Sequence, residues 1–302
     1  MLDFPCNIFQ TPGCIGAIAY RTESKCAVVI GDPLCPKDEI SKLSEAFHSY
    51  CLKSGLNIIY ITVSENFAKW AKNYCKISME VCEEFIFDPE IDICKVNSRV
   101  RRKINTATKH GLTIHEYIPN PIDKELEKSF LQIAKKWQES IKGPNVYLGH
   151  LNFFVNYTGR RWFYVKDGEK VTSMLMLTRM EISNGWLLKY MVTSPDAIQS
   201  TSEFLVTSLF KILKSENCRF LTKGPMPIDL LGEIRGFSSF MVWFIAFIYK
   251  IINWFYKLKK RKLYWFRYQP KLSPIYLLFY RPHIGINEIR ALRKSFRTGD
   301  PQ

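Results

Sequence analysis

The fold class is decided by residues 27–63, AVVIGDPLCPKDEISKLSEAFHSYCLKSGLNIIYITV. Two short runs rich in β-branched residues, Ala27–Ile30 and Asn57–Val63, are typical of strands. Between them, apolar residues recur at helical spacing over about Lys37–Ser54. A strand, a helix and a second strand in this order predict an α/β fold.

The same alternation continues toward both ends of the chain. Around the first stretch, the patterns predict strands at Ile15–Tyr20 and Ser78–Phe87, and helices at Glu65–Asn73 and Val96–Gly111. A later series predicts a helix at Ser200–Ser215 and strands at Arg161–Lys166, Thr172–Thr178, Trp186–Val192 and Arg219–Thr222. We therefore expect mixed sheets flanked by helices in two successive lobes of similar architecture.

A boundary between the lobes is expected at YIPNPID, residues 117–123. Its two prolines disfavour helix and precede a new helical pattern at Lys124–Ile141. This predicts a first lobe over residues 1–118 and a second lobe over residues 119–302.

An apolar, aromatic helix is predicted at Phe240–Tyr256, directly before KLKKRK, residues 257–262. At 1.5 Å per residue it would reach only about 25 Å, which is short of a hydrocarbon core. It therefore suits a core helix, a helix lying in a membrane surface or, least well, a membrane-spanning helix. In the second case, we expect membrane contact from Trp243, Phe247, Lys259, Lys260 and Arg261.

Charge and cysteine content narrow the function classes. The chain carries 43 Lys and Arg against 28 Asp and Glu, a net charge of +15, which favours anionic partners such as nucleic acid or an anionic membrane. Its nine cysteines are scattered and form no C-x-x-C pair, so we expect neither a zinc site nor a disulfide framework. Asp3 and Pro5 lie where a signal peptide would be basic and then apolar, so we expect a cytoplasmic protein.

Several motifs, in matching order and spacing, resemble the catalytic domain of bacterial phosphatidylglycerol lysyltransferases, the multiple peptide resistance factor family. The first lobe contributes GDPLCP (residues 31–36), KISMEVCEEFIF (76–87) and SRVRRKINTATKHG (98–111). The second lobe contributes Trp137, WLLKYMVTSPDA (186–197), TKGPMP (222–227) and RYQPKLSPIYL (267–277). The resemblance covers roughly residues 31–280.

This resemblance implies a tandem of GCN5-related acyltransferase lobes that moves an amino acid from aminoacyl-tRNA to a lipid hydroxyl. It implies aminoacyl-tRNA as a co-substrate, no other cofactor, and an anionic membrane lipid as acceptor, with peripheral association at the inner face of the cytoplasmic membrane. Three positions depart from the family pattern: Lys189 and Val192 replace an Asp-x-x-Arg pair, and Trp265 replaces a lysine. Nothing in the sequence predicts the oligomeric state or the amino acid carried.

Acyl transfer needs a positioned acceptor and a group that stabilises the tetrahedral oxyanion. No Ser-His-Asp order or nucleophile elbow is present, so direct attack of the acceptor on the bound ester is expected. The candidate catalytic residues are Arg267 and Lys271, as electrostatic stabilisers, and Lys189, as a contact to phosphate or to the acyl group.

Two further sets of residues are candidates for binding the donor. The predicted basic helix supplies Arg99, Arg101, Arg102 and Lys103 for tRNA phosphates, although a solvated basic face has the same composition. The GPMP segment after a predicted strand supplies Gly224 and Met226 as a candidate acyl-donor turn, although a rigid structural turn reads the same way.

Two other functions fit the same sequence. A CoA-dependent N-acetyltransferase shares the lobe, but normally carries an [RQ]-x-x-G-x-[GA] turn, which QTPGCI at Gln10–Ile15 does not match. The replaced Asp-x-x-Arg pair leaves open a non-catalytic member that binds RNA or a membrane.

Overall fold

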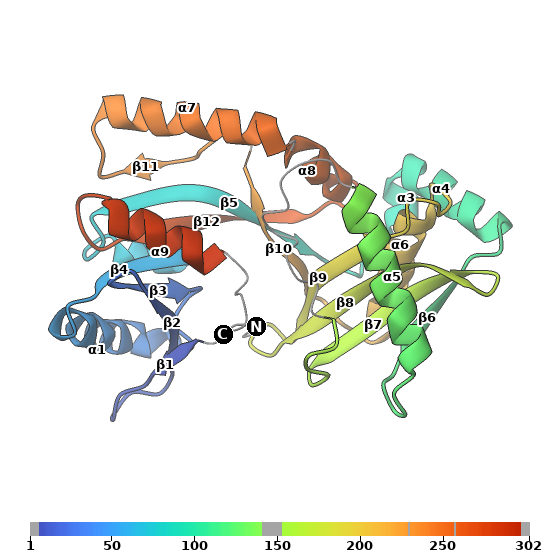
Figure 1. Ribbon diagram of the computed structural model, residues 1–302, viewed down its shortest axis with the longest axis horizontal. Helices are drawn as coiled ribbons and strands as arrows, with labels where there is room; N and C mark the ends of the chain where they lie inside the picture. Colours follow the sequence, from blue (N-terminus) through green and yellow to red (C-terminus); the bar gives the residue numbers. More distant parts are fainter. Residues whose placement is uncertain (1–5, 141–152, 229, 257, 297–302) are drawn as a thin grey trace. The chain divides into compact units, whose positions relative to one another are not determined.

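The computed structural model describes residues 6–140, 153–228, 230–256 and 258–296, without the side chains of residues 252–261 and 296. Its residues form mixed sheets flanked by helices (Figure 1), which confirms the predicted fold class. Contacts divide the chain into two compact units. The first unit comprises Met1–Glu84, Pro225–Lys259 and Ser273–Gln302, and the second comprises Phe85–Gly224 and Lys260–Leu272.

In the first unit the strand order is β1-β2-β3-β4-β12-β5, with β11 paired to β5. The strands are β1 (Asn7–Phe9), β2 (Ile18–Glu23), β3 (Cys26–Ile30), β4 (Asn57–Ser64), β5 (Ile77–Phe87), β11 (Ile234–Arg235) and β12 (Lys271–Phe279). The helices are η1 (Lys37–Glu39), α1 (Ile40–Lys53), α2 (Glu65–Ala71), α7 (Ser239–Tyr256) and α9 (Ile286–Phe296).

The core of the first unit follows from the alternation of side chains along β4. Ile58 and Tyr60 point to one face and pack with Phe47 of α1. Ile59 and Ile61 point to the other face and pack with Ala291 of α9. Each face therefore buries its own apolar layer under helices, and each fully buried side chain of this size contributes about 1.5–3 kcal/mol.

In the second unit the strand order is β10-β9-β8-β7-β6. The strands are β6 (Thr113–Tyr117), β7 (Arg160–Asp167), β8 (Lys170–Met180), β9 (Gly185–Thr193) and β10 (Leu221–Pro227). The helices are α3 (Ile93–Val96), α4 (Ser98–Lys109), α5 (Lys124–Ser140), α6 (Thr201–Ser215) and α8 (Leu258–Phe266). Trp162 lies fully buried in a core cluster with Phe130 of α5.

Both units repeat one motif. In the first, β2 and β3 are antiparallel and α1 connects β3 to the parallel strand β4. In the second, β8 and β9 are antiparallel and α6 connects β9 to the parallel strand β10. The predicted repetition of architecture is therefore present, with a helix crossing over between each parallel pair.

The units do not follow the expected division at residues 118 and 119. Strand β6 pairs with β7 through Tyr117 and Trp162, and α4 packs on α6, so residues 85–118 belong with the second unit. At the other end of the chain, β12 pairs with β4 through Ile275 and Ser64, so this strand is mostly part of the first unit.

One further expectation is modified and another is confirmed. The expected turn at Gly224–Pro227 belongs to β10, which extends to Pro227. The expected apolar helix is present as α7. Among the described residues, no helix combines the length and apolar character that crossing a membrane requires.

Candidate active site

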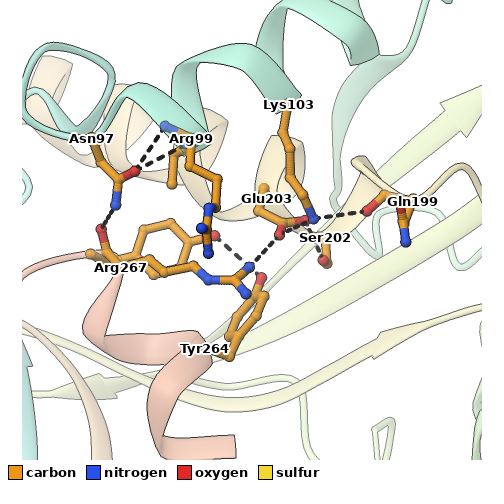
Figure 2. A network of polar contacts seen from close by, with 10 residues as sticks. Asn97, Arg99, Lys103, Gln199, Ser202, Glu203, Tyr264 and Arg267 are labelled. Atoms are coloured by element: carbon orange, nitrogen blue, oxygen red, sulfur yellow. Dashed lines mark hydrogen bonds and ion pairs between the residues drawn. The ribbon is translucent and has the colours of Figure 1, made fainter. Parts of the chain in front are cut away.

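A buried carboxylate lies at the centre of a polar network in the second unit. Glu203 is on α6, and 2% of its side chain is exposed. Its Oε1 accepts a hydrogen bond from Lys103 Nζ of α4 at 2.5 Å and from Arg267 Nη1 at 2.8 Å (Figure 2). The Ser202 hydroxyl donates to Oε2 at 2.9 Å. Because a buried carboxylate is costly unless it is paired, the two cations compensate its desolvation.

Asn97 ties the start of α4 to the same network. Its side-chain oxygen accepts hydrogen bonds from the backbone N–H groups of Arg99 and Val100, which caps the helix. Its side-chain amide donates to the main-chain carbonyl of Arg267 at 3.1 Å (Figure 2). The position of Arg267 is therefore fixed through both its main chain and its side chain.

Aromatic residues at the end of α8 surround Arg267. Its guanidinium lies 5.5 Å from the centre of the Tyr264 ring, which favours a cation–π contact. The Tyr264 and Tyr268 hydroxyls lie 3.2 Å apart, and burial raises the pKa of Tyr264 to about 12. Tyr264 therefore keeps its proton near neutral pH and adds no negative charge beside Arg267.

Strands β9 and β10 separate close to this network. Their main-chain pairing extends to Thr222, opposite Leu187. One residue later, Lys223 Nζ donates to the main-chain carbonyl of Leu188 at 3.2 Å. Gly224 has φ +76° and donates its N–H to the Thr222 hydroxyl. A left-handed glycine and a lysine side chain therefore replace regular pairing where β10 leaves β9.

Helix α8 connects this separation to the Glu203 network. The Lys223 ammonium lies 5.9 Å from the centre of the Trp265 ring, and Trp265 is two residues before Arg267. Lys189, in β9, lies next to the separation, and burial lowers the pKa of its ammonium group. These side chains offer cations and a protonated phenol, which suit an anionic or polarised oxygen. Within the described residues, no group of three His, Cys, Asp or Glu side chains could hold a metal ion.

The family model for the C-terminal domain of phosphatidylglycerol lysyltransferases matches residues 3–279. The chain belongs to this family. It is therefore a member of a family of acyltransferase domains, as the motifs implied. A comparison with curated proteins gives no match.

Solved structures share the fold of this phosphatidylglycerol lysyltransferase family member. L-PGS from Bacillus licheniformis is 17% identical, with a TM-score of 0.75 over 98% of this chain and 90% of that one. The C-terminal domain (DUF2156) of an Agrobacterium fabrum protein assigned as a lysylphosphatidylglycerol synthetase is 14% identical, with a TM-score of 0.71 over 96% and 88%. FemX is 9% identical, with a TM-score of 0.55 over 91% and 87%.

The three predicted catalytic residues occupy different places in this lysyltransferase-family fold. Arg267 lies in the Glu203 network, and Lys189 is half-buried in β9. Lys271 is exposed at the start of β12. Val192, at one of the two departures in β9, is buried in the core of the second unit, where an apolar side chain fits.

The predicted phosphate-binding residues separate into two groups on α4. Arg99, Arg101 and Arg102 are exposed, whereas Lys103 is half-buried and pairs with Glu203. The helix is amphipathic, since Val100, Ile104 and Ala107 are its buried positions. Gly111, at φ +76°, ends it as predicted.

The candidate acyl-donor and membrane residues are also placed. Gly224 is buried in the second unit and Met226 is half-buried in the first, both within β10. On α7, Trp243 and Phe247 are 62% and 50% exposed, and their rings are stacked with centres 5.8 Å apart. The side chains of Lys259, Lys260 and Arg261 lie outside the described residues.

Sequence reasoning missed Glu203 and Lys223. Glu203 lies among Phe204, Leu205 and Val206 in TSEFLVTSLF, a helix whose positions are otherwise mostly apolar or small. A single acid in such a helix, in a chain with this excess of cations, is a signal for a buried ion pair. Lys223 carried no such signal, because its role depends on the separation of β9 and β10.

Proposed function

We propose that this chain transfers an aminoacyl group from aminoacyl-tRNA to a hydroxyl group of an anionic membrane lipid. Family membership supplies the reaction class. The observation that carries the proposal is that Lys103 joins the basic helix α4 to Arg267 at the Glu203 carboxylate. A helix suited to a phosphate backbone is thus linked through the Glu203 carboxylate to Arg267, a cation suited to a developing oxyanion.

The donor reaches the site along α4. Exposed arginines bind phosphates in a sequence-independent way, as needed for the shared acceptor end of tRNA. The segment from Lys95 to His115 contains six Lys or Arg and no acid. The separated strands β9 and β10, where Lys223 contacts the main chain of Leu188, then receive the aminoacyl group.

The reaction is a direct displacement at the ester carbon. The lipid hydroxyl oxygen attacks that carbon, a new C–O bond forms, and the bond to the terminal ribose oxygen breaks. The proton of the lipid hydroxyl ends on the ribose oxygen that leaves. Arg267 stabilises the oxyanion between these two steps, and its fixed geometry means that little reorganisation is needed.

Helix α7 provides the contact with the membrane that contains the acceptor. Its exposed apolar residues recur at i, i+3, i+4, i+7, i+8 and i+11, which forms one stripe: Phe240, Trp243, Phe244, Phe247, Ile248 and Ile251. The opposite face is held by the first unit, since Ile245 packs on its core and the Tyr249 hydroxyl donates to the carbonyl of Ile228 at 2.9 Å. Residues 234–287 contain ten Lys or Arg and no acid, so an anionic lipid surface suits this stripe.

A CoA-dependent reaction finds less support in the turns between strand and helix. In the first unit the segment between β3 and η1, GDPLCP, contains one glycine but two prolines, which have no N–H group. In the second unit the segment between β9 and α6, SPDAIQS, contains no glycine. Neither segment matches the glycine-containing turn whose backbone amides hold a pyrophosphate.

Ligand-induced stabilisation distinguishes the two donors. A ligand that binds only the folded state raises the melting temperature increasingly as its concentration exceeds its Kd. We expect deacylated tRNA to raise the melting temperature and acetyl-CoA over the same concentration range to leave it unchanged. A shift with acetyl-CoA alone would reject the proposed donor.

A further inference from the structure

We infer that Glu203 is a positioning residue whose buried carboxylate holds Lys103 and Arg267 together, so that the pair binds one phosphodiester group of the tRNA acceptor end. This rests on the proposed function, and it assigns a role to an acid that no family motif quoted above contains.

The geometry places both cations on one oxygen atom. Lys103 Nζ and Arg267 Nη1 lie 2.5 and 2.8 Å from Glu203 Oε1, so they lie at most the sum of these distances, 5.3 Å, apart (Figure 2). A single phosphate can contact two nitrogens at that separation, with one oxygen for each. The N–H groups on Nη2 and Nε of Arg267 then remain for the oxyanion, since a guanidinium has five donors. Without the carboxylate, two positive groups so close would repel one another and separate.

The solvent exposure of the three side chains suits the binding of an anion from solvent. The Glu203 side chain is 2% exposed, whereas the side chains of Lys103 and Arg267 are 30% and 31% exposed. The carboxylate is therefore shielded from solvent, whereas both cations are partly accessible to it. Two cations and one carboxylate leave a net charge of +1 on the accessible side.

A second ion cluster in the same unit shows the opposite balance. Arg161 donates to both Glu116 and Glu216 at 2.7 Å, which leaves a net charge of −1. That cluster repels an anion, and its contacts join β6, β7 and the end of α6. The excess of cations at Glu203 is therefore a local property and not a general feature of ion pairs in this unit.

The position of Lys103 favours RNA over lipid as the source of the phosphate. Lys103 shares α4 with the exposed Arg99, Arg101 and Arg102. A phosphate bound at Lys103 and Arg267 is therefore the next contact of a backbone that follows α4. Binding of lipid phosphate at the same pair is one outcome of the test below.

The variant Glu203→Gln distinguishes positioning of the two cations from long-range attraction, because the two predict opposite changes in tRNA affinity. The variant loses one negative charge, so long-range attraction alone predicts tighter binding of deacylated tRNA. Positioning predicts weaker binding, by about three- to tenfold at constant salt, because the two cations lose their common acceptor. The control Glu169→Gln removes an acid whose side chain is fully exposed in the β7–β8 turn, and its affinity should stay equal or rise slightly.

Equal or tighter tRNA binding by folded Glu203→Gln would overturn the inference. So would weaker binding to phosphatidylglycerol vesicles with unchanged tRNA binding, which would assign the phosphate to lipid. If the glutamine variant does not unfold cooperatively, Glu203→Asp decides. It keeps the charge but withdraws the carboxylate by one methylene, so affinity must still fall.

A second readout does not depend on the proposed function. The 15N relaxation of the Arg267 Nε–H group, assigned with Arg267→Lys, should show a rigid side chain in the unmodified protein and a mobile one in Glu203→Gln. An equally rigid side chain in both proteins would contradict the positioning role, even if neither bound tRNA. A loss of rigidity in a protein that never binds tRNA would instead reject the donor and keep the positioning role.

Discussion

His48 lies among aromatic side chains in the first unit, where burial disfavours its protonated form. Its side chain is buried, and its Nε2 lies 2.8 Å from the Tyr60 hydroxyl. Burial lowers the pKa of this imidazole from 6.5 to about 4. Between these two pKa values the unfolded chain binds a proton that the folded chain excludes. Stability should therefore fall by about 3 kcal/mol as the pH falls through this window.

Urea unfolding at about pH 7 and about pH 4.5 measures this loss. The variant His48→Gln cannot be protonated, so its stability should change less between the two values than that of the unmodified protein. His110→Gln, at an exposed histidine after α4, should retain the full change. Identical pH dependence in all three proteins would show that His48 does not contribute.

At the residue scale, the sequence indicated which side chains could bind or react, but not which residues they contact. Arg267 was a candidate because it is a cation within a resembling motif, and the structure places it at Glu203. Lys103 was grouped with its neighbours on α4, yet its ammonium pairs with Glu203 of α6 and only 30% of its side chain is exposed. Such pairings depend on which helices pack together, and a single helix pattern does not contain that information.

At the scale of elements, α4 makes a prediction about salt dependence. Changing Arg99, Arg101 and Arg102 together to Ala should weaken tRNA binding and make its salt dependence shallower. The slope of the logarithm of the binding constant against the logarithm of salt concentration should decrease by about 0.7–0.9 for each phosphate that the variant no longer neutralises. Lys103 is left out because its removal would disturb Glu203. The matched control changes Lys128, Lys135 and Lys136 of α5, which are equally exposed and remove the same charge. Equal effects of the two triple variants would show that only net charge matters.

Substitutions on the two faces of α7 should have opposite effects on membrane binding and on stability. Trp243→Ser with Phe247→Ser should abolish co-sedimentation with phosphatidylglycerol vesicles and leave the melting temperature nearly unchanged, because both rings are exposed. Ile245→Ser, on the face that packs on the core of the first unit, should lower the melting temperature through a buried hydroxyl and a cavity. Vesicle binding that survives the double variant would remove α7 from the membrane contact.

At the scale of the whole molecule, the sequence predicted which segments are helices and strands but not which unit each belongs to. The patterns around α1, α6 and α7 agree with the structure to within a few residues, because helical and strand periodicities are local. The pairing of β12 with β4 joins Ile275 to Ser64, and no local pattern encodes a contact at that separation. The proline-containing segment at residues 117–123 marks the loop between β6 and α5, which lies within the second unit.

Aminoacyl transfer from tRNA to lipid can be detected in a single reaction. The purified protein is incubated with total charged tRNA and a bacterial lipid extract, and the lipids are analysed by mass spectrometry with and without ribonuclease. The account predicts an anionic lipid whose mass rises by one amino acid residue and which is absent after ribonuclease treatment. An unchanged lipid profile, obtained with folded protein that binds both tRNA and the vesicles, would contradict it.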